Sequence, residues 1–397
     1  MAETEQPSGG PPTVAYSGAF GEAWKLAIKT AFLTVITLGV YRFWAKTRLR
    51  RYFWSRIAVA GEPLEYDGTG LELFLGFLVV ILIMAPLYAA IGWGQLYAAE
   101  TPMLAIALQG IPLLLLLALI PVAVYRARRY RLSRTVWRGI RGGLAGSTWG
   151  YWKRALLYGL VGWLTLGLLR PLAHVRLTRY LVGHTRFGSG RFGFDARVRE
   201  LMLPWLLAWV PGVLTMAAYI GFLVSAGIAA TQADPAGDMQ NLDMLQGLDP
   251  ELFGLGGGGV SLLGLCAFVF YIRYQLHMVR TFARATTFEG IAFATGIRFW
   301  RIVGIFAALF AVYAATIAIA VAIGFAVAPA FVALFVVVGV FFAATLFAPM
   351  ATHRLLRHFV TTLEISGRID LDALTRGDGP RPRTGEGLAS VFDVDAF

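Results

Sequence analysis

Residues 302–352 contain no Asp, Glu, Lys, Arg or His. As one continuous helix this run would extend about 75 Å at ~1.5 Å per residue, more than twice the ~30 Å hydrocarbon thickness of a bilayer. The run therefore predicts two membrane-spanning helices joined by a tight turn near Gly324 to Pro329. Hydrophobic residues make up 57% of the 397-residue chain and charged residues 15%, a balance that indicates lipid rather than water as the main solvent.

The same length criterion identifies four further apolar segments that are long enough to span a bilayer: 71–93, 103–125, 201–230 and 259–277. Together with the two helices of 302–352 they predict an α-helical polytopic membrane protein with about six transmembrane helices.

A short basic signature recurs where long apolar stretches end: alanine, two residues, arginine, two residues, arginine, then tyrosine or histidine. The copies are Ala45/Arg48/Arg51/Tyr52, Ala123/Arg126/Arg129/Tyr130, Ala173/Arg176/Arg179/Tyr180 and Ala351/Arg354/Arg357/His358, with a degenerate fifth at His277/Arg280/Thr281. A glycine follows nine or ten residues after the tyrosine position each time, at Gly61, Gly139, Gly190, Gly290 and Gly367. This spacing indicates a repeated unit.

The charge distribution predicts the orientation. The 232–258 loop has five acidic residues and no Lys or Arg, whereas the segments that carry the signature are rich in arginine. By the positive-inside rule we expect the basic helix ends and both termini in the cytoplasm, and the acidic loop outside. The net charge of +12 then reflects topology rather than nucleic-acid binding.

Two apolar segments, 24–44 and 150–172, fit this scheme poorly as spans because each is flanked by cytoplasmic signals on both sides. They match one another at an offset of 128 residues, and each contains a Thr-Leu-Gly sequence that predicts a helix break, at Thr37/Gly39 and Thr165/Gly167. We interpret them as broken helices that are re-entrant or lie in the interface, which requires shielding of the freed backbone by neighbouring protein. The alternative is eight full spans with an external N-terminus.

After each basic helix end, apolar residues alternate with a period of two up to the glycine, as in Ile57 and Val59 before Gly61. This pattern predicts short β-hairpins. Because a lone hairpin is marginal in water, we expect the copies to pair as a small cytoplasmic β layer. Irregular loops with aromatic residues in the interface are the alternative.

The run from Thr37 to Lys46, its continuation through Arg51-Tyr52-Phe53-Trp54, and the segment from Tyr66 to Leu73 resemble the signature of the YjgN-like family of bacterial inner-membrane proteins. The resemblance extends over nearly the whole chain from about Tyr16. It implies the bacterial inner membrane as the location. The function of that family is unknown, so it implies no catalytic or ligand-binding residues.

The repeats divide the chain into predicted parts. We expect a disordered N-terminus (1–15), a first repeat unit (16–140) and a second (141–300), each with a re-entrant helix and two spans. A transmembrane hairpin with a basic exit (301–368) and a disordered C-terminal tail (369–397) follow.

A search for chemistry finds no catalytic residues, no metal site and no cofactor motif, so we do not expect an enzyme. Two hypotheses of function remain. In the first, a membrane binding or scaffold protein presents a cytoplasmic arginine-rich face to anionic phospholipid. In the second, an uncoupled transporter, channel or lipid-moving protein handles an anionic or amphipathic solute, with Arg42 and Arg170 at the helix breaks. The candidate anion-binding residues are Arg42, Arg48, Arg51, Arg126, Arg129, Arg170, Arg176, Arg179, Arg354 and Arg357. The sequence identifies neither a protein partner nor an oligomeric state.

Overall fold

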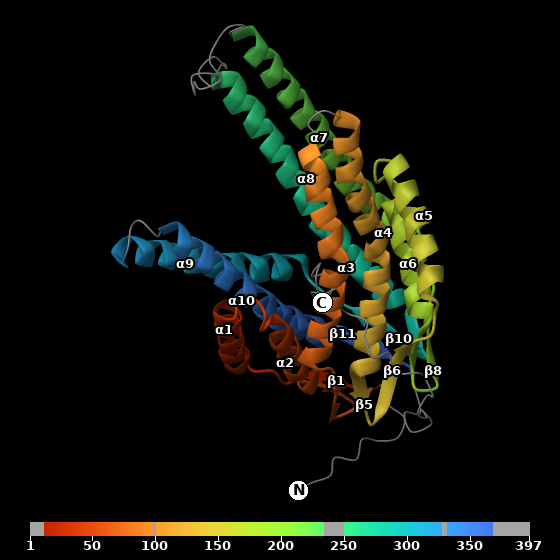
Figure 1. Cartoon of the computed structure of the whole chain (residues 1–397). Helices are drawn as coiled ribbons and strands as arrows, with labels where there is room; N and C mark the ends of the chain where they lie inside the picture. The colour runs from red at the N-terminus through yellow and green to blue at the C-terminus, as the bar shows by residue number, and fades with distance from the viewer. Residues whose placement is uncertain (1–11, 98–100, 234–249, 328–331, 368–397) are drawn as a thin grey trace. The chain divides into compact units, whose positions relative to one another are not determined.

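Helices in pairs alternate with short strands along the described part of the chain (Figure 1). The computed structural model describes residues 12–97, 101–233, 250–327 and 332–367. In chain order the elements are β1 (Val14–Tyr16), α1 (Phe20–Ile36), α2 (Arg42–Ser55), β2 (Ile57–Val59), β3 (Glu62–Pro63), β4 (Glu65–Tyr66), α3 (Gly70–Tyr97), α4 (Pro102–Arg134), β5 (Thr135–Trp137), β6 (Ile140–Leu144), α5 (Thr148–Leu164), α6 (Arg170–Gly183), β7 (Thr185–Phe187), β8 (Gly190–Phe194), α7 (Arg199–Ala233), α8 (Pro250–Ala285), β9 (Thr286–Phe288), β10 (Ile291–Thr295), α9 (Phe299–Val327), α10 (Val332–Thr361) and β11 (Leu363–Ser366).

The strands form an antiparallel meander in chain order. One sheet has the order β1-β2-β3 and the other the order β11-β10-β9-β8-β7-β6-β5-β4, with only Leu64 between β3 and β4. Successive strands are connected alternately by a short turn and by a pair of helices. Because neighbouring strands are antiparallel, the short turns connect the strands at one end, and the helix pairs connect them at the other end.

The turns have the backbone conformation that right-handed strand twist favours in two-residue hairpins. Both central residues have positive φ at Ala60–Gly61 (50° and 83°), Arg138–Gly139 (50° and 72°) and Glu289–Gly290 (43° and 87°), a pattern typical of type I′ turns. In the turn between β7 and β8, Gly190 is the last residue, and the positive φ of 56° falls on Gly188.

The strand register separates an apolar face of the sheet from a polar one. Trp137 and Phe187 contact each other on the apolar face, with 6.0 Å between ring centroids, and the Phe192 and Phe288 rings pack in a tilted arrangement with 4.5 Å between centroids. Arg186 and Arg191 lie directly opposite one another on the other face, and both are exposed. The alternation that predicted strands is therefore the alternation between these two faces.

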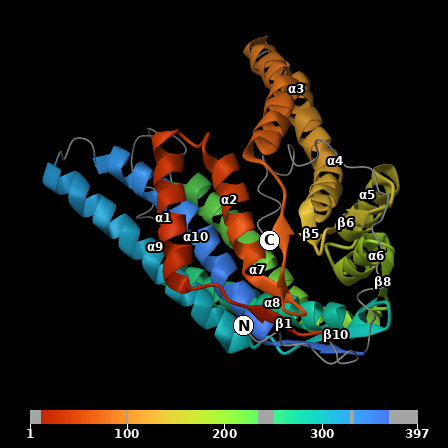
Figure 2. The same ribbon diagram turned by 90° about the horizontal axis from the view of Figure 1, so that it is seen from below.

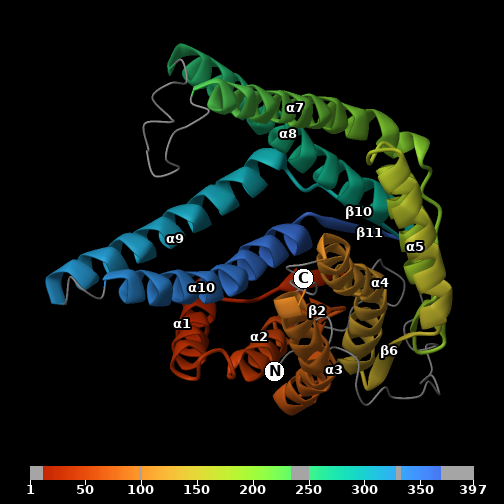
Figure 3. The same cartoon turned by 45° about the horizontal axis from the view of Figure 1, so that its top comes forward.

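Two compact units can be described separately. One comprises residues 1–157, 176–195 and 283–397 and includes all the strands; the other comprises residues 158–175 and 196–282. In the first, α1 packs against α10, and α10 lies beside α9 (Figures 2 and 3). Ala23, Ala27 and Ala31 form the buried stripe of α1, and such small side chains allow two helices to approach closely.

Five helices in the described ranges are long and apolar enough to cross a membrane: Gly70–Gln95, Arg199–Gly221, Gly258–Ala285, Phe299–Val327 and Val332–Thr361. The sixth predicted span, 103–125, lies within the continuous helix α4, several of whose side chains are outside the described set. The number of spans stays a prediction.

Two details of the sequence interpretation need correction. Val14 and Ala15, assigned to a disordered N-terminus, form β1, because β2 offers a strand partner to this alternating segment. Gly324 is not in a turn: α9 continues through it to Val327, and the connection to α10 falls on residues 328–331, outside the described ranges. Most of the acidic loop (234–249), residues 1–11 and the tail from 368 also lie outside them.

Candidate functional site

The tyrosine position of the repeated signature ties the second helix of each pair back to the start of the first helix. The Tyr52 hydroxyl donates to the Ala19 carbonyl (3.1 Å), Tyr130 donates to the Glu72 carboxylate, and Tyr180 donates to the Ser147 carbonyl (2.8 Å). In the last repeat, His358 Nε2 accepts from the Arg298 amide at 3.2 Å. These contacts give the tyrosine or histidine a structural role.

The degenerate repeat makes the same kind of contact from another position. Thr281 stands where the other copies have tyrosine or histidine. One helical turn earlier on α8, His277 Nε2 lies 3.1 Å from the Glu200 carbonyl in the first turn of α7. The deviation in sequence therefore corresponds to a shifted contact between the same two helix ends.

The first arginine of the signature has the same position in all four complete copies. Arg48, Arg126, Arg176 and Arg354 each precede the following strand by nine residues, which corresponds to about 13 Å of helix above the sheet edge. Arg48, Arg126 and Arg176 are exposed, and within the described ranges none of the three forms an ion pair. Arg354 is half-buried over the Phe20 ring, at 5.5 Å from its centroid.

In two copies of the signature, the second arginine contacts another part of the chain. Arg51 donates to the Gly68 carbonyl at 2.8 Å, and Arg179 lies 3.8 Å from Asp195. Gly68 and Asp195 both belong to the segments that lead from a strand into the next helix. Arg129 is half-buried and Arg357 is exposed. The two arginines of a copy thus have different surroundings, although they share a helix face.

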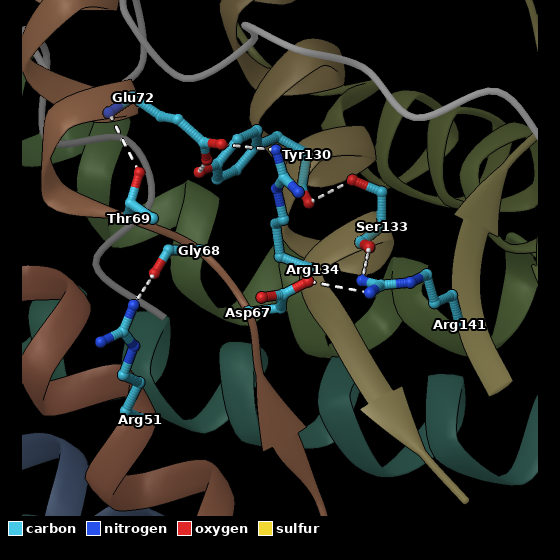
Figure 4. A network of polar contacts seen from close by, with 9 residues as sticks. All are labelled: Arg51, Asp67, Gly68, Thr69, Glu72, Tyr130, Ser133, Arg134 and Arg141. Carbon is cyan, nitrogen blue, oxygen red and sulfur yellow. Dashed lines mark hydrogen bonds and ion pairs between the residues drawn. The ribbon is translucent and has the colours of Figure 1, made fainter. Parts of the chain in front are cut away.

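A polar network joins the first turn of α3 to the end of α4 (Figure 4). The Glu72 carboxylate accepts from the Tyr130 hydroxyl and from the Arg134 guanidinium, the latter at 2.6 Å. The Arg134 side chain is only 11% exposed and that of Glu72 26%. Below them, Arg141 pairs with Asp67 at 2.8 Å. These contacts close the α3–α4 hairpin where it meets the sheet.

This network was not among the sites that the sequence patterns predicted. Arg50 was also missed: it is buried, and it donates to the Tyr66 hydroxyl at 3.0 Å. A usable signal was available in Glu72, because an acidic residue at the start of an apolar span needs a partner.

Both predicted helix breaks are turns between two helices. Gly39, with φ 91°, donates from its amide to the Thr34 carbonyl at 2.7 Å, and Gly167, with φ 84°, donates to the Gly162 carbonyl at 2.6 Å. These bonds form Schellman motifs. Arg42 and Arg170 are the first residues of α2 and α6, and both are exposed.

No three His, Cys, Asp or Glu side chains in the described ranges are grouped so that they could hold a metal ion. The described structure fits one class of protein: a multi-pass helical membrane protein whose helix pairs are connected through a meander of antiparallel strands.

The chain belongs to a family of bacterial proteins of unknown function (DUF898), whose sequence profile matches residues 11–391. It is 24% identical over 245 residues to the inner membrane protein YjgN of Salmonella typhimurium, and 27% identical over 233 residues to that of Escherichia coli O157:H7. The matches cover 54% and 50% of this chain, and 59% and 56% of those relatives. No solved structure matches. The resemblance to the YjgN-like family is confirmed, and the apolar helices fit a multi-pass membrane protein.

Proposed function

We propose that this protein binds anionic phospholipids of the inner membrane through the arginines at the ends of its second helices, and so acts as a membrane binding or scaffold protein. One observation carries the proposal: Arg48, Arg126 and Arg176 are exposed at the same distance from the strands that follow them. If these arginines only set the orientation of the protein in the membrane, their charges would be needed, but their equal spacing from the strands would not.

The proposed level is the headgroup region. In α4 the last apolar stretch ends at Arg126, and eight further residues of helix separate this arginine from β5. The strands would then lie in the cytoplasm, about 13 Å beyond the headgroups. Positive-inside bias supports this orientation, in which both termini are cytoplasmic.

One such arginine should contribute little to lipid binding, but several at one level should give a clear preference for anionic lipid. A basic residue near an anionic leaflet contributes about 1 kcal/mol, and the attraction falls off within a Debye length of about 8 Å at physiological salt. Three arginines at one level would together contribute roughly 3 kcal/mol, which corresponds to about a hundredfold preference for anionic over neutral lipid.

The test is lipid retention, measured by native mass spectrometry of protein purified from membranes that contain phosphatidylglycerol and phosphatidylethanolamine. Arg48→Gln/Arg176→Gln should lose most of the retained phosphatidylglycerol. Arg186→Gln/Arg191→Gln is the matched control, since it removes two exposed arginines from the sheet, and it should retain the lipid. Orientation is verified with a single cysteine at Ala236 on a Cys266→Ala background. Equal retention by both double variants would contradict the proposal.

The second hypothesis, uncoupled transport of an anionic or amphipathic solute, has a different readout. It predicts solute or lipid flux in proteoliposomes, and that flux should depend on Arg42 and Arg170 rather than on Arg48 and Arg176.

A further inference from the structure

In the corners between α1 and α2 (residues 37–41) and between α5 and α6 (residues 165–169), a threonine hydroxyl pairs two backbone groups. The Thr37 hydroxyl donates to the Leu33 carbonyl at 2.8 Å and accepts from the Tyr41 amide at 2.9 Å. Thr165 does the same between the Val161 carbonyl (2.8 Å) and the Leu169 amide (3.3 Å). One threonine thus bridges the last turn of one helix and the residue that precedes the next helix.

In the second corner, two indole groups of helix α7 donate to carbonyl groups of the break. The Trp209 indole donates to the Leu166 carbonyl at 2.9 Å, and the Trp205 indole donates to the Gly167 carbonyl at 3.1 Å. Water would satisfy such groups at a soluble surface. Satisfaction by protein groups is the condition for a helix break inside hydrocarbon.

Each corner places a leucine in a conformation that glycine would adopt more easily. Leu38 has φ 50° and Leu166 has φ 49°, in the left-handed region that is strained for residues with a Cβ. Leu38 is 93% exposed and Leu166 is 77% exposed, so neither side chain contributes much to packing within the chain. The Schellman motif accounts for the left-handed backbone but does not require a leucine there, because glycine adopts this conformation at lower cost.

The neighbours of both leucines are also apolar and exposed. Ile36 and Val40 flank Leu38, while Trp163 and Leu164 precede Leu166. In both corners an exposed arginine follows four residues after the leucine, Arg42 in one and Arg170 in the other. An apolar tip with a nearby cation matches the boundary between acyl chains and headgroups.

We propose that the two corners are wedges that insert Leu38 and Leu166 into the acyl-chain region of the cytoplasmic leaflet. This inference rests on the proposed function in one respect, the placement of the basic helix ends on the cytoplasmic side of the membrane. Arg42 and Arg170 follow the leucines by four residues, and their long side chains extend back to the headgroups, which keeps the insertion shallow. The wedges therefore occupy the upper part of one leaflet and do not cross the bilayer. Such shallow insertion spreads the lipids of one leaflet.

The test is depth-dependent quenching in proteoliposomes of neutral phosphatidylcholine, with Cys266→Ala as background. Leu38→Cys and Leu166→Cys are labelled with an environment-sensitive fluorophore and quenched by iodide on both sides of the vesicle, or by lipid with a spin label at acyl carbon 5. Arg186→Cys is the aqueous control, and Leu82→Cys on α3 is the control within a span.

We expect iodide quenching constants at Leu38 and Leu166 at least threefold below that of Arg186→Cys, and stronger quenching by the acyl spin label than at Arg186. Iodide quenching equal to that of Arg186→Cys would overturn the proposal. Because these vesicles contain no anionic lipid, insertion can succeed where selective anionic-lipid binding fails, so the two failures are distinguishable.

A second variant separates insertion from folding. Leu38→Gly removes the wedge side chain and relieves the left-handed strain, so thermal stability in detergent should be retained. Iodide quenching at Val40→Cys should then rise at least twofold compared with the same label beside Leu38. Unchanged quenching at Val40 would show that the leucine does not anchor the corner in lipid.

Discussion

Replacing Glu72 should destabilise the α3–α4 hairpin more than the loss of a surface ion pair would. The Glu72 carboxylate is the partner of both Tyr130 and Arg134, and the Arg134 guanidinium is 11% exposed. In Glu72→Gln the guanidinium keeps its burial but loses its counter-charge, which is the costly way to break such a pair.

The size of the effect follows from this partial burial. Two unit charges about 4 Å apart attract by about 4 kcal/mol at an effective dielectric constant of 20. Desolvation of the arginine offsets part of this, which leaves a coupling free energy of about 2 kcal/mol between Glu72 and Arg134. The Glu22–Arg56 pair has a similar separation of 2.7 Å, but its side chains are 52% and 37% exposed. Its coupling should stay below about 1 kcal/mol.

The assay is a double-mutant cycle on each pair, Glu72→Gln with Arg134→Gln and Glu22→Gln with Arg56→Gln. Free energies of unfolding are measured by titrating detergent micelles with dodecyl sulfate and following tryptophan fluorescence. A Glu72–Arg134 coupling no larger than that of Glu22–Arg56 would refute the reasoning that burial, rather than distance, sets the strength of these pairs.

Two other changes test the sheet and the second unit. Gly139→Val should lower the free energy of unfolding by about 1–2 kcal/mol, because valine is strained at φ 72°. Gly143→Val is the control: Gly143 lies in an extended strand where a Cβ meets nothing within 4 Å, so the free energy of unfolding should change by less than about 0.5 kcal/mol. Equal effects of the two variants in chemical denaturation would contradict the turn assignment. Burial, and to a lesser extent Arg170, lowers the pKa of His174 from 6.5 to about 4, so the unfolded chain binds the proton more readily and stability should fall as pH falls from about 6.5 to 4. His174→Phe should flatten this dependence in a pH series of thermal unfolding, and an unchanged slope would show that His174 is not its source.

The local features of this chain were predictable because they depend on short-range physics. The alternation around Thr135 and Trp137 predicted a strand, and Gly139 marked the turn, since both signals act within a few residues. The Thr-Leu-Gly sequences likewise marked the ends of α1 and α5. Such signals need no knowledge of tertiary contacts.

The contacts that join distant segments could not be read from these patterns. Tyr130 and Glu72 are 58 residues apart, and nothing in either local sequence specifies the pair. The separate surroundings of Arg48 and Arg51 were missed for the same reason: their spacing fixes a helix face, but the Gly68 carbonyl that binds Arg51 comes from the segment beyond β4.

The meander has a consequence for synthesis of the protein. Strands that are neighbours in a sheet are also consecutive in the chain. A new strand can therefore pair with the previous one as soon as the turn or helix pair between them has been synthesised. Each of the two sheets can therefore grow by one strand at a time while the ribosome is still translating, and no described strand waits for a partner made much later. Each helix pair delivered to the membrane brings the next strand to the growing edge, so insertion and folding advance together from the N-terminus until β11 closes the series.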